Sequence, residues 1–335
     1  MRSLINFLLG TLFLISGALK LMDPVGANFI VEGYLDFMHI GFLPSHFLAV
    51  AIPLFESLLG VCILSRVFRK VISVLTIATS VFFLLISLAL VIFNPAMDCG
   101  CFGEAIHLTH IQTLIKNIAI LLAAFYVFSD IKKKKKQKSH YVGFALASAA
   151  VIGLCIYSGT NIPPVDFTSY ARNVDGLLVL DRYGNFTQDE LSGGDILTVS
   201  VYDAEKMSPE DWADVSESIY LAESNDIRSI ILIASNPDNL ETLSEQNPVL
   251  EDLFERVFLS DPRSLATLNR SNGGYMLTHE GQVVSKWAKG KLPDKKGWNK
   301  MLKNGLDEYQ IKTSAKRRNM FATLLLYSIA VTQLF

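Results

Sequence analysis

Two cysteines separated by one glycine are the residues of this sequence best suited to chemistry. Cys99 and Cys101 lie in a polar loop between two long apolar segments, whereas Cys62 and Cys155 lie within apolar segments, where cysteine is usually a small buried side chain. A disulfide between Cys99 and Cys101 would close a tight ring, for which Gly100 supplies backbone freedom. Strained, exposed disulfides are the more oxidising ones. The spacing favours thiol–disulfide exchange and leaves a structural disulfide as an alternative.

A metal site is another interpretation of the same loop. Asp98, Cys99, Cys101, His107 and His110 lie close together in the sequence, and thiolate with imidazole suits Zn²⁺. The two cysteines are spaced more tightly than the about two to four residues usual between zinc ligands. His110 could instead begin the next helix. A metal held by Cys99, Cys101, His107 and His110 is therefore the weaker alternative.

A carboxylate and an amine lie in apolar segments, where charge is costly and usually functional. Glu56 is in the middle of the second apolar segment, and Lys20 ends the first. We expect the Lys20 amine to extend toward water, so the two would pair only if their depths in the membrane match. Glu56 is either a packed, hydrogen-bonded carboxyl or a group that handles protons beside a quinone-like ligand.

The N-terminal half of the chain is strongly apolar. Half of the 335 residues are apolar and 19% are charged, and most of the apolar excess lies before residue 159. A membrane-spanning helix needs about 20 mostly apolar residues. Five stretches qualify, at residues 5–22, 43–64, 71–93, 111–128 and 141–157. A shorter stretch at 27–40 reads as an interfacial helix, and 320–335 reads as a transmembrane or interfacial helix of open orientation.

Basic residues in the short loops predict the orientation of the spans. With the N-terminus in the cytoplasm, that side collects ten basic residues, Arg2, Arg66, Arg69, Lys70, Lys132, Lys133, Lys134, Lys135, Lys136 and Lys138. The opposite side of the first four spans holds only Lys20. The cysteine loop and everything after residue 158 are then extracytoplasmic. Lys316, Arg317 and Arg318 conflict with this rule if the last segment crosses inward, because they would then lie outside. The net charge of −2 shows no nucleic-acid footprint.

The residues after 160 read as a soluble α/β domain. Strands are predicted at 196–202, 228–234 and 257–260, helices at 209–224 and 240–253, and a hairpin at 275–278 and 283–287. Ser208 is the expected N-cap of the first helix. Alternating strands and helices suggest βαβ units, and the hairpin makes the sheet mixed.

The first 130 residues resemble the DoxX/MauE membrane family. The resemblance rests on Ser16-Gly17-Ala18-Leu19-Lys20, Pro53-x-x-Glu56-x-x-x-Gly60, Cys99-Gly-Cys101-Phe-Gly103 and Lys116-Asn117. It implies a four-helix membrane bundle and, from MauE-type members, disulfide formation or maturation of an exported partner. The architecture is also similar to quinone-linked vitamin K epoxide reductase-like enzymes. Those enzymes use Cys-x-x-Cys and a second cysteine pair, which this chain lacks.

Residues 165–304 resemble a thioredoxin-like domain, whose last hairpin is similar to residues 281–287. The loop where that family places Cys-x-x-Cys runs here from Ala204 to Pro209 without a cysteine, and Gly273-Gly274 replaces the usual proline before the hairpin. Thiolate chemistry requires a thiol. We therefore expect a redox-silent domain that docks a partner or shields the membrane site.

Together these features predict a membrane α-helical protein with a four-helix DoxX/MauE-like bundle at 1–130. A basic cytoplasmic loop and fifth span follow at 131–159, then a degenerate extracytoplasmic thioredoxin-like domain at 160–315 and a C-terminal apolar helix at 316–335. We expect a multi-pass protein of the bacterial cytoplasmic (inner) membrane, with Cys99, Cys101 and Glu56 catalytic. It would exchange disulfides with an exported protein in the periplasm, with a quinone as the candidate cofactor. The alternative is a non-catalytic scaffold that presents a partner-binding domain.

Overall fold

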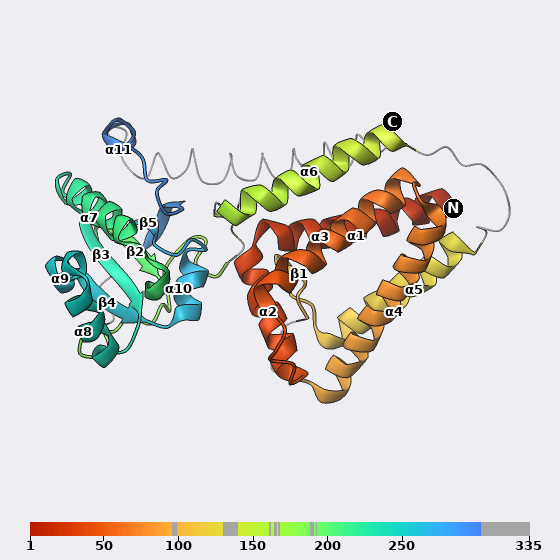
Figure 1. The fold of residues 1–335 in the computed structure, drawn as a ribbon, viewed down its shortest axis with the longest axis horizontal. Helices are drawn as coiled ribbons and strands as arrows, with labels where there is room; N and C mark the ends of the chain where they lie inside the picture. The colour runs from red at the N-terminus through yellow and green to blue at the C-terminus, as the bar shows by residue number, and fades with distance from the viewer. Residues whose placement is uncertain are drawn as a thin grey trace. The chain divides into compact units, whose positions relative to one another are not determined.

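The structure is a computed structural model that describes residues 1–95, 99–129, 140–160, 162–163, 166, 168–187, 191 and 193–302. The chain divides after Gly159 into two compact units, unit 1 before that residue and unit 2 after it (Figure 1). Several features named above lie outside the described residues: Asp98, the lysine run at 132–138 and the apolar segment at 320–335 with the three basic residues before it.

Unit 1 consists of helices and one short strand. Its elements are α1 (Arg2–Met22), α2 (Pro24–Phe37), α3 (Ser45–Ser65), α4 (Arg69–Phe93), β1 (Cys101–Glu104), α5 (His110–Phe128) and α6 (Tyr141–Thr160). Among the described residues, five helices, α1, α3, α4, α5 and α6, are long and apolar enough to cross a membrane. The five predicted spans are confirmed, and unit 1 is a multi-pass membrane domain. The shorter α2 begins earlier than predicted because Asp23 caps it and Pro24 occupies its first turn.

Glycines bring α1 and α3 into close contact. A Cβ atom on Gly60 would lie 2.5 Å from the backbone nitrogen of Leu14, and a Cβ on Gly17 would lie 2.3 Å from Ser57 Oγ. Small residues of this kind let helix backbones approach, which supplies van der Waals packing that lipid cannot replace. The two helices run side by side in Figure 1.

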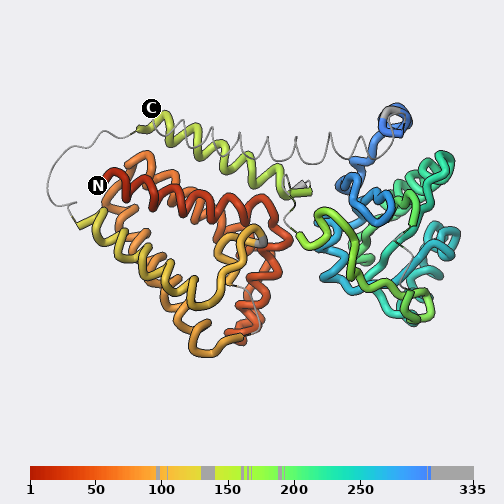
Figure 2. The backbone as a smooth tube through the Cα atoms, turned by 180° about the vertical axis from the view of Figure 1, so that it is seen from behind, coloured from red at the N-terminus to blue at the C-terminus, as the bar shows by residue number. Residues whose placement is uncertain are grey.

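The connection between α4 and α5 carries the two predicted catalytic cysteines. It turns back against α1 and α2 as the short strand β1, which the sequence did not predict (Figure 2). Thr109 then starts α5 with a reciprocal capping box to Gln112. His110 is therefore the first residue of that helix, as one interpretation of the sequence proposed.

Unit 2 is an α/β thioredoxin-like domain built on a mixed sheet. Its strands are β2 (Asp195–Val201), β3 (Arg228–Ala234), β4 (Val257–Ser260), β5 (Gly274–His279) and β6 (Gln282–Trp287), in the order β4-β3-β2-β5-β6. The strands β2, β3 and β4 are parallel, and the β5–β6 hairpin is antiparallel to β2. All the strands predicted for this region are confirmed.

Helices cover both faces of this sheet. They are α7 (Pro209–Glu223), α8 (Pro237–Gln246), α9 (Pro248–Asp252), α10 (Pro262–Leu268) and α11 (Lys295–Leu302), with short 3₁₀ turns at Ala204–Lys206 and Phe254–Arg256. Ser208 caps α7 as expected. The stretch 240–253, predicted to be mostly helical, is helical but divides into α8 and α9, because Pro248 interrupts the first helix and Asn247 caps the second. Helices α10 and α11 were not predicted.

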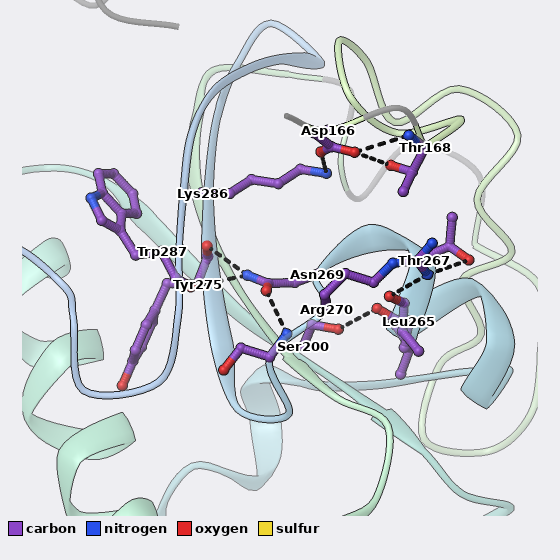
Figure 3. A network of polar contacts seen from close by, with 12 residues as sticks. Asp166, Thr168, Ser200, Leu265, Thr267, Asn269, Arg270, Tyr275, Lys286 and Trp287 are labelled. Carbon is purple, nitrogen blue, oxygen red and sulfur yellow. Dashed lines mark hydrogen bonds and ion pairs between the residues drawn. The ribbon is translucent and has the colours of Figure 1, made fainter. Parts of the chain in front are cut away.

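A buried amide replaces the proline usual before the hairpin of unit 2 (Figure 3). Asn269 Nδ2 donates to the carbonyl oxygens of Tyr275 at 3.0 Å and Trp287 at 3.1 Å. A Cβ atom on Gly274 would lie 2.6 Å from the Asn269 amide, so the glycine is required there. Nearby, the mostly buried Lys286 and Asp166 form an ion pair at 2.7 Å. The domain thus has the thioredoxin-like fold, although the Asn269 side chain instead of a proline fixes the loop before the hairpin.

We predict that Gly60→Ala destabilises unit 1 by about 1–3 kcal/mol, the usual effect of overpacking, because the new methyl group meets the α1 backbone. The matched control is Gly153→Ala in α6, where nothing lies within 4 Å of the added Cβ. That change should be neutral or stabilising by up to about 1 kcal/mol, since alanine favours helix. All four cysteines lie in unit 1, so a thiol-reactive dye can follow the unfolding of this unit. The protein, with Cys99 and Cys101 replaced by serine, is heated with the dye, which labels Cys62 and Cys155 as they become exposed. Equal melting temperatures for the two variants would contradict the prediction.

Candidate functional site

A cavity of about 410 Å³ lies inside unit 1, a volume typical of small-molecule sites. Residues from α1 to α5 and from the cysteine loop line it, and most of the wall is aliphatic or aromatic. The few polar groups that converge on it include Lys20, Tyr34, Glu56, Cys99, Cys101 and Lys116. The structure thus brings all three predicted catalytic residues to one cavity, although they are up to 45 positions apart in the sequence.

Hydrogen bonds to backbone carbonyls hold the cysteine loop at the cavity. The Tyr34 hydroxyl of α2 donates to the Cys99 carbonyl at 2.7 Å, and Ser16 Oγ of α1 donates to the Cys101 carbonyl at 2.6 Å. Gly100 between them has φ +59°, and a Cβ there would lie 2.2 Å from Cγ2 of Ile30 on α2. The positive φ and the close packing of α2 therefore both require glycine here. The sequence had suggested it only as a source of backbone freedom for closing a Cys99–Cys101 disulfide ring.

The two thiols differ sharply in acidity. Both cysteines are unpaired. A hydrogen bond from the Cys101 thiol is the main cause that lowers the pKa of Cys99 to about 5; burial opposes it, and Thr113 and Lys116 add to it. The same hydrogen bond, together with burial, raises the pKa of Cys101 far above its usual range. Cys99 is therefore a thiolate at neutral pH, and Cys101 holds its proton.

Lys20 and Glu56 form an ion pair at the wall of the cavity. Lys20 Nζ lies 2.7 Å from one carboxylate oxygen and 3.0 Å from the other, and the two side chains are 13% and 1% exposed. The expectation that Lys20 turns toward water is wrong. The close approach of α1 and α3 at Gly17 places Lys20, one turn later, level with Glu56, so pairing replaces hydration. Ser16 Oγ also lies 3.1 Å from Glu56 and thus joins the carboxylate to the cysteine loop.

The histidines of the metal alternative lie apart from this arrangement. His107 is exposed, and His110 Nδ1 lies 3.2 Å from the side-chain oxygen of Asn94. Within the part of the chain that the structure describes, which excludes Asp98, no three His, Cys, Asp or Glu side chains come close enough to hold a metal ion. The described residues give the metal alternative no support.

One functional side chain, Tyr34, was not singled out from the sequence, and Lys116 appeared there only in the family motif Lys116-Asn117, with no role assigned. Tyr34 lies on α2 and gives no signal, because an uncharged tyrosine in an amphipathic helix is ordinary. Lys116 lies on α5 with Nζ 5.2 Å from the centre of the Phe102 ring. An amine within an apolar segment is the same signal that singled out Glu56, and it could have identified Lys116.

Comparison with known proteins decides the class of unit 1. Residues 1–129 match the family of the methylamine utilisation protein MauE. These residues form a MauE family domain. The chain is also 30% identical over 112 residues to Protein TlpB of Flavobacterium psychrophilum. That similarity covers 33% of this chain and 30% of TlpB, so less than a third of the relative's length is spanned. No solved structure matches the chain.

We predict an unusual pH profile for Cys99 of the MauE domain. Its lowered pKa means that the reactive thiolate is already formed well below neutrality. Alkylation of reduced protein by iodoacetamide, followed at Cys99 by mass spectrometry, should rise with pH through about 5 and then level off.

Cys101→Ala is the informative variant, because it removes the hydrogen bond that lowers this pKa most. Its alkylation rate should keep rising toward the ordinary cysteine pKa of about 8.5. A wild-type profile that also climbs to that pH would show that Cys99 is an ordinary thiol.

Proposed function

We propose that this protein is a membrane thiol–disulfide oxidoreductase that acts on exported proteins through Cys99 and Cys101. The observation that carries the proposal is the pairing of a stabilised thiolate with a protonated thiol on the wall of an apolar cavity. A low-pKa cysteine beside a second cysteine is the arrangement expected of exchange chemistry. A purely structural pair would need no such asymmetry.

The acidity of the two thiols gives each sulfur a role in the exchange. With the pair oxidised, a substrate thiolate attacks Cys101, and Cys99 leaves as the thiolate because a low-pKa thiol leaves faster. The second substrate thiol then displaces Cys101, which takes up a proton. The substrate gains a disulfide, and the pair gains two electrons and becomes the reduced form seen here.

The cavity fits a quinone as the group that reoxidises the pair. Its walls are apolar, Lys116 can donate to a quinone carbonyl, and the buried Asn117 Oδ1, which has no hydrogen-bond partner among the described residues, can accept from a hydroxyl of the reduced quinone. A bound quinone would accept two electrons and two protons. Cys99 supplies the thiolate, Cys101 releases one proton, and the Glu56 carboxylate beside Lys20 relays the second proton from water.

The position in the cell is part of the proposal. Ten basic residues on one side support an extracytoplasmic cysteine loop and unit 2, in a bacterial inner membrane. The chain has no cysteine after Cys155, so unit 2 cannot exchange disulfides itself. We propose that it docks the exported partner and leaves the redox step to the MauE domain.

The competing function is a membrane scaffold, which the cysteine-free unit 2 also supports. Thiol trapping in intact cells, with acid quenching and alkylation, separates the two functions. We expect Cys99 and Cys101 to be mostly oxidised during respiration and reduced when quinone oxidation is blocked. Cys99→Ser and Cys101→Ser should each abolish substrate oxidation at normal protein level, whereas Cys62→Ser and Cys155→Ser should not. Full function of the Cys99→Ser, Cys101→Ser double variant would favour the scaffold.

We predict that Glu56→Gln is destabilising by about 3–5 kcal/mol, because it leaves the Lys20 ammonium without its counter-charge in an apolar wall. Lys20→Met combined with Glu56→Gln removes both charges and should recover most of the stability. Thermal unfolding and disulfide-forming turnover are measured for both variants. A proton-handling Glu56 predicts that the double variant is stable and still slow. Full turnover in the double variant would show that Glu56 is only a packing group.

A further inference from the structure

Lys116 is the charged cavity residue whose part in the redox step itself is still to be assigned. It lies on α5, half-buried, at the same cavity wall as Cys99 and Cys101. Its ammonium group rests 5.2 Å from the centre of the Phe102 ring, which follows Cys101 in the loop. A cation against the ring face of a neighbouring loop residue is favourably placed, so Lys116 is held beside the two sulfurs.

Among the described side chains that line the cavity, the charges do not cancel without the cysteines. Lys20 and Glu56 neutralise each other at 2.7 Å. Among the side chains that the structure describes, no carboxylate pairs with Lys116. Its positive charge acts on both sulfurs and favours a thiolate at either. The other titratable group facing the sulfurs is the neutral phenol of Tyr34 from α2. In the reduced protein, the Cys99 thiolate is therefore the counter-charge of Lys116.

We propose that Lys116 is the charge-balancing partner of the cysteine pair: it balances the Cys99 thiolate in the reduced protein and, once the sulfurs are joined, would stabilise negative charge on a bound quinone. This inference rests on the proposed function. Oxidation forms the Cys99–Cys101 bond and removes two electrons from the sulfurs and one proton from Cys101. A bound quinone would take up both electrons and that proton, and the Lys116 ammonium would stabilise the remaining negative charge until a second proton arrives.

A half-buried ammonium that loses its counter-charge carries a desolvation cost. Negative charge moved onto a bound quinone would remove this cost, so Lys116 would favour the electron transfer. Before oxidation the same ammonium stabilises the thiolate, and this makes the reduced pair more stable. Lys116 thus acts on the cysteine pair in the absence of any quinone, and that action can be measured separately.

The two effects give Lys116→Met an unusual signature. Without the ammonium, the alkylation profile of Cys99 should shift to higher pH. The pair should also be more oxidised in a given dithiothreitol redox buffer, because its reduced form has lost stabilisation. Oxidation by a short-chain ubiquinone should nevertheless slow on the order of a hundredfold, the usual effect of removing one electrostatic donor. A merely structural lysine would not make the pair easier to oxidise at equilibrium and slower to react.

The experiment uses the full-length protein in detergent, with Lys116→Arg as the charge-preserving variant and the exposed Lys70→Met of α4 as the matched control. Lys116→Arg should retain the profile, the equilibrium and most of the rate, and Lys70→Met should match wild type. If Lys116→Met does not fold, Lys116→Gln takes its place in all three measurements.

The outcomes separate this inference from the proposed function. A wild-type pair that ubiquinone oxidises, together with unchanged alkylation and redox equilibrium in Lys116→Met, overturns the role of Lys116 and leaves the oxidoreductase intact. A wild-type pair that ubiquinone does not oxidise overturns both the quinone step and the role of Lys116 toward it. A profile shift in Lys116→Met with an unchanged rate of quinone oxidation also overturns the inference.

Discussion

The close contact between α1 and α3 is the constraint on which the membrane site depends. Gly17 allows the α1 backbone to approach Ser57, and the next turn of α1 then reaches across to α3. Because of this approach, Lys20 meets Glu56 instead of water, and Ser16 touches both Glu56 and the backbone of the cysteine loop. A wider separation of the two helices would hydrate the carboxylate and detach the loop at once.

The acidity of Cys99 arises from its neighbours within the loop more than from distant charge. Its largest stabilising partner is Cys101, two residues away, and burial works against it. Such a local source of asymmetry needs a rigid backbone, since a hydrogen bond between two sulfurs is lost with small changes in the turn. The carbonyl contacts from Tyr34 and Ser16 supply that rigidity from two different helices.

The sequence predicted the large elements of this protein because each has a strong local signal. The five apolar spans, the mixed sheet and the capped start of α7 all follow from periodicity and capping residues. The short helices α10 and α11 did not follow, since helices of this length are stabilised mainly by packing. The strand β1 was not predicted because the elements it contacts, α1 and α2, lie far from it in the sequence.

The site was predictable only in part for a related reason. Cys99, Cys101 and Glu56 stand out by residue type, and the cavity brings them together. The direction of Lys20 was mispredicted because snorkelling describes a helix alone in lipid, whereas here a neighbouring helix offers a buried carboxylate. Tyr34 acts through one hydrogen bond to a carbonyl, and no property of the residue in the sequence indicates such a bond.

The residue between the two cysteines carries information about a different part of the chain. A side chain at Gly100 would overlap Ile30 of α2, so its identity records how closely that helix seals the sulfur-bearing turn. Substitutions at the two positions should therefore be linked in evolution: a bulkier residue at 100 would need a smaller one at 30. The Cys-Gly-Cys motif therefore reflects the packing of α2 over the loop as well as the chemistry of the two thiols.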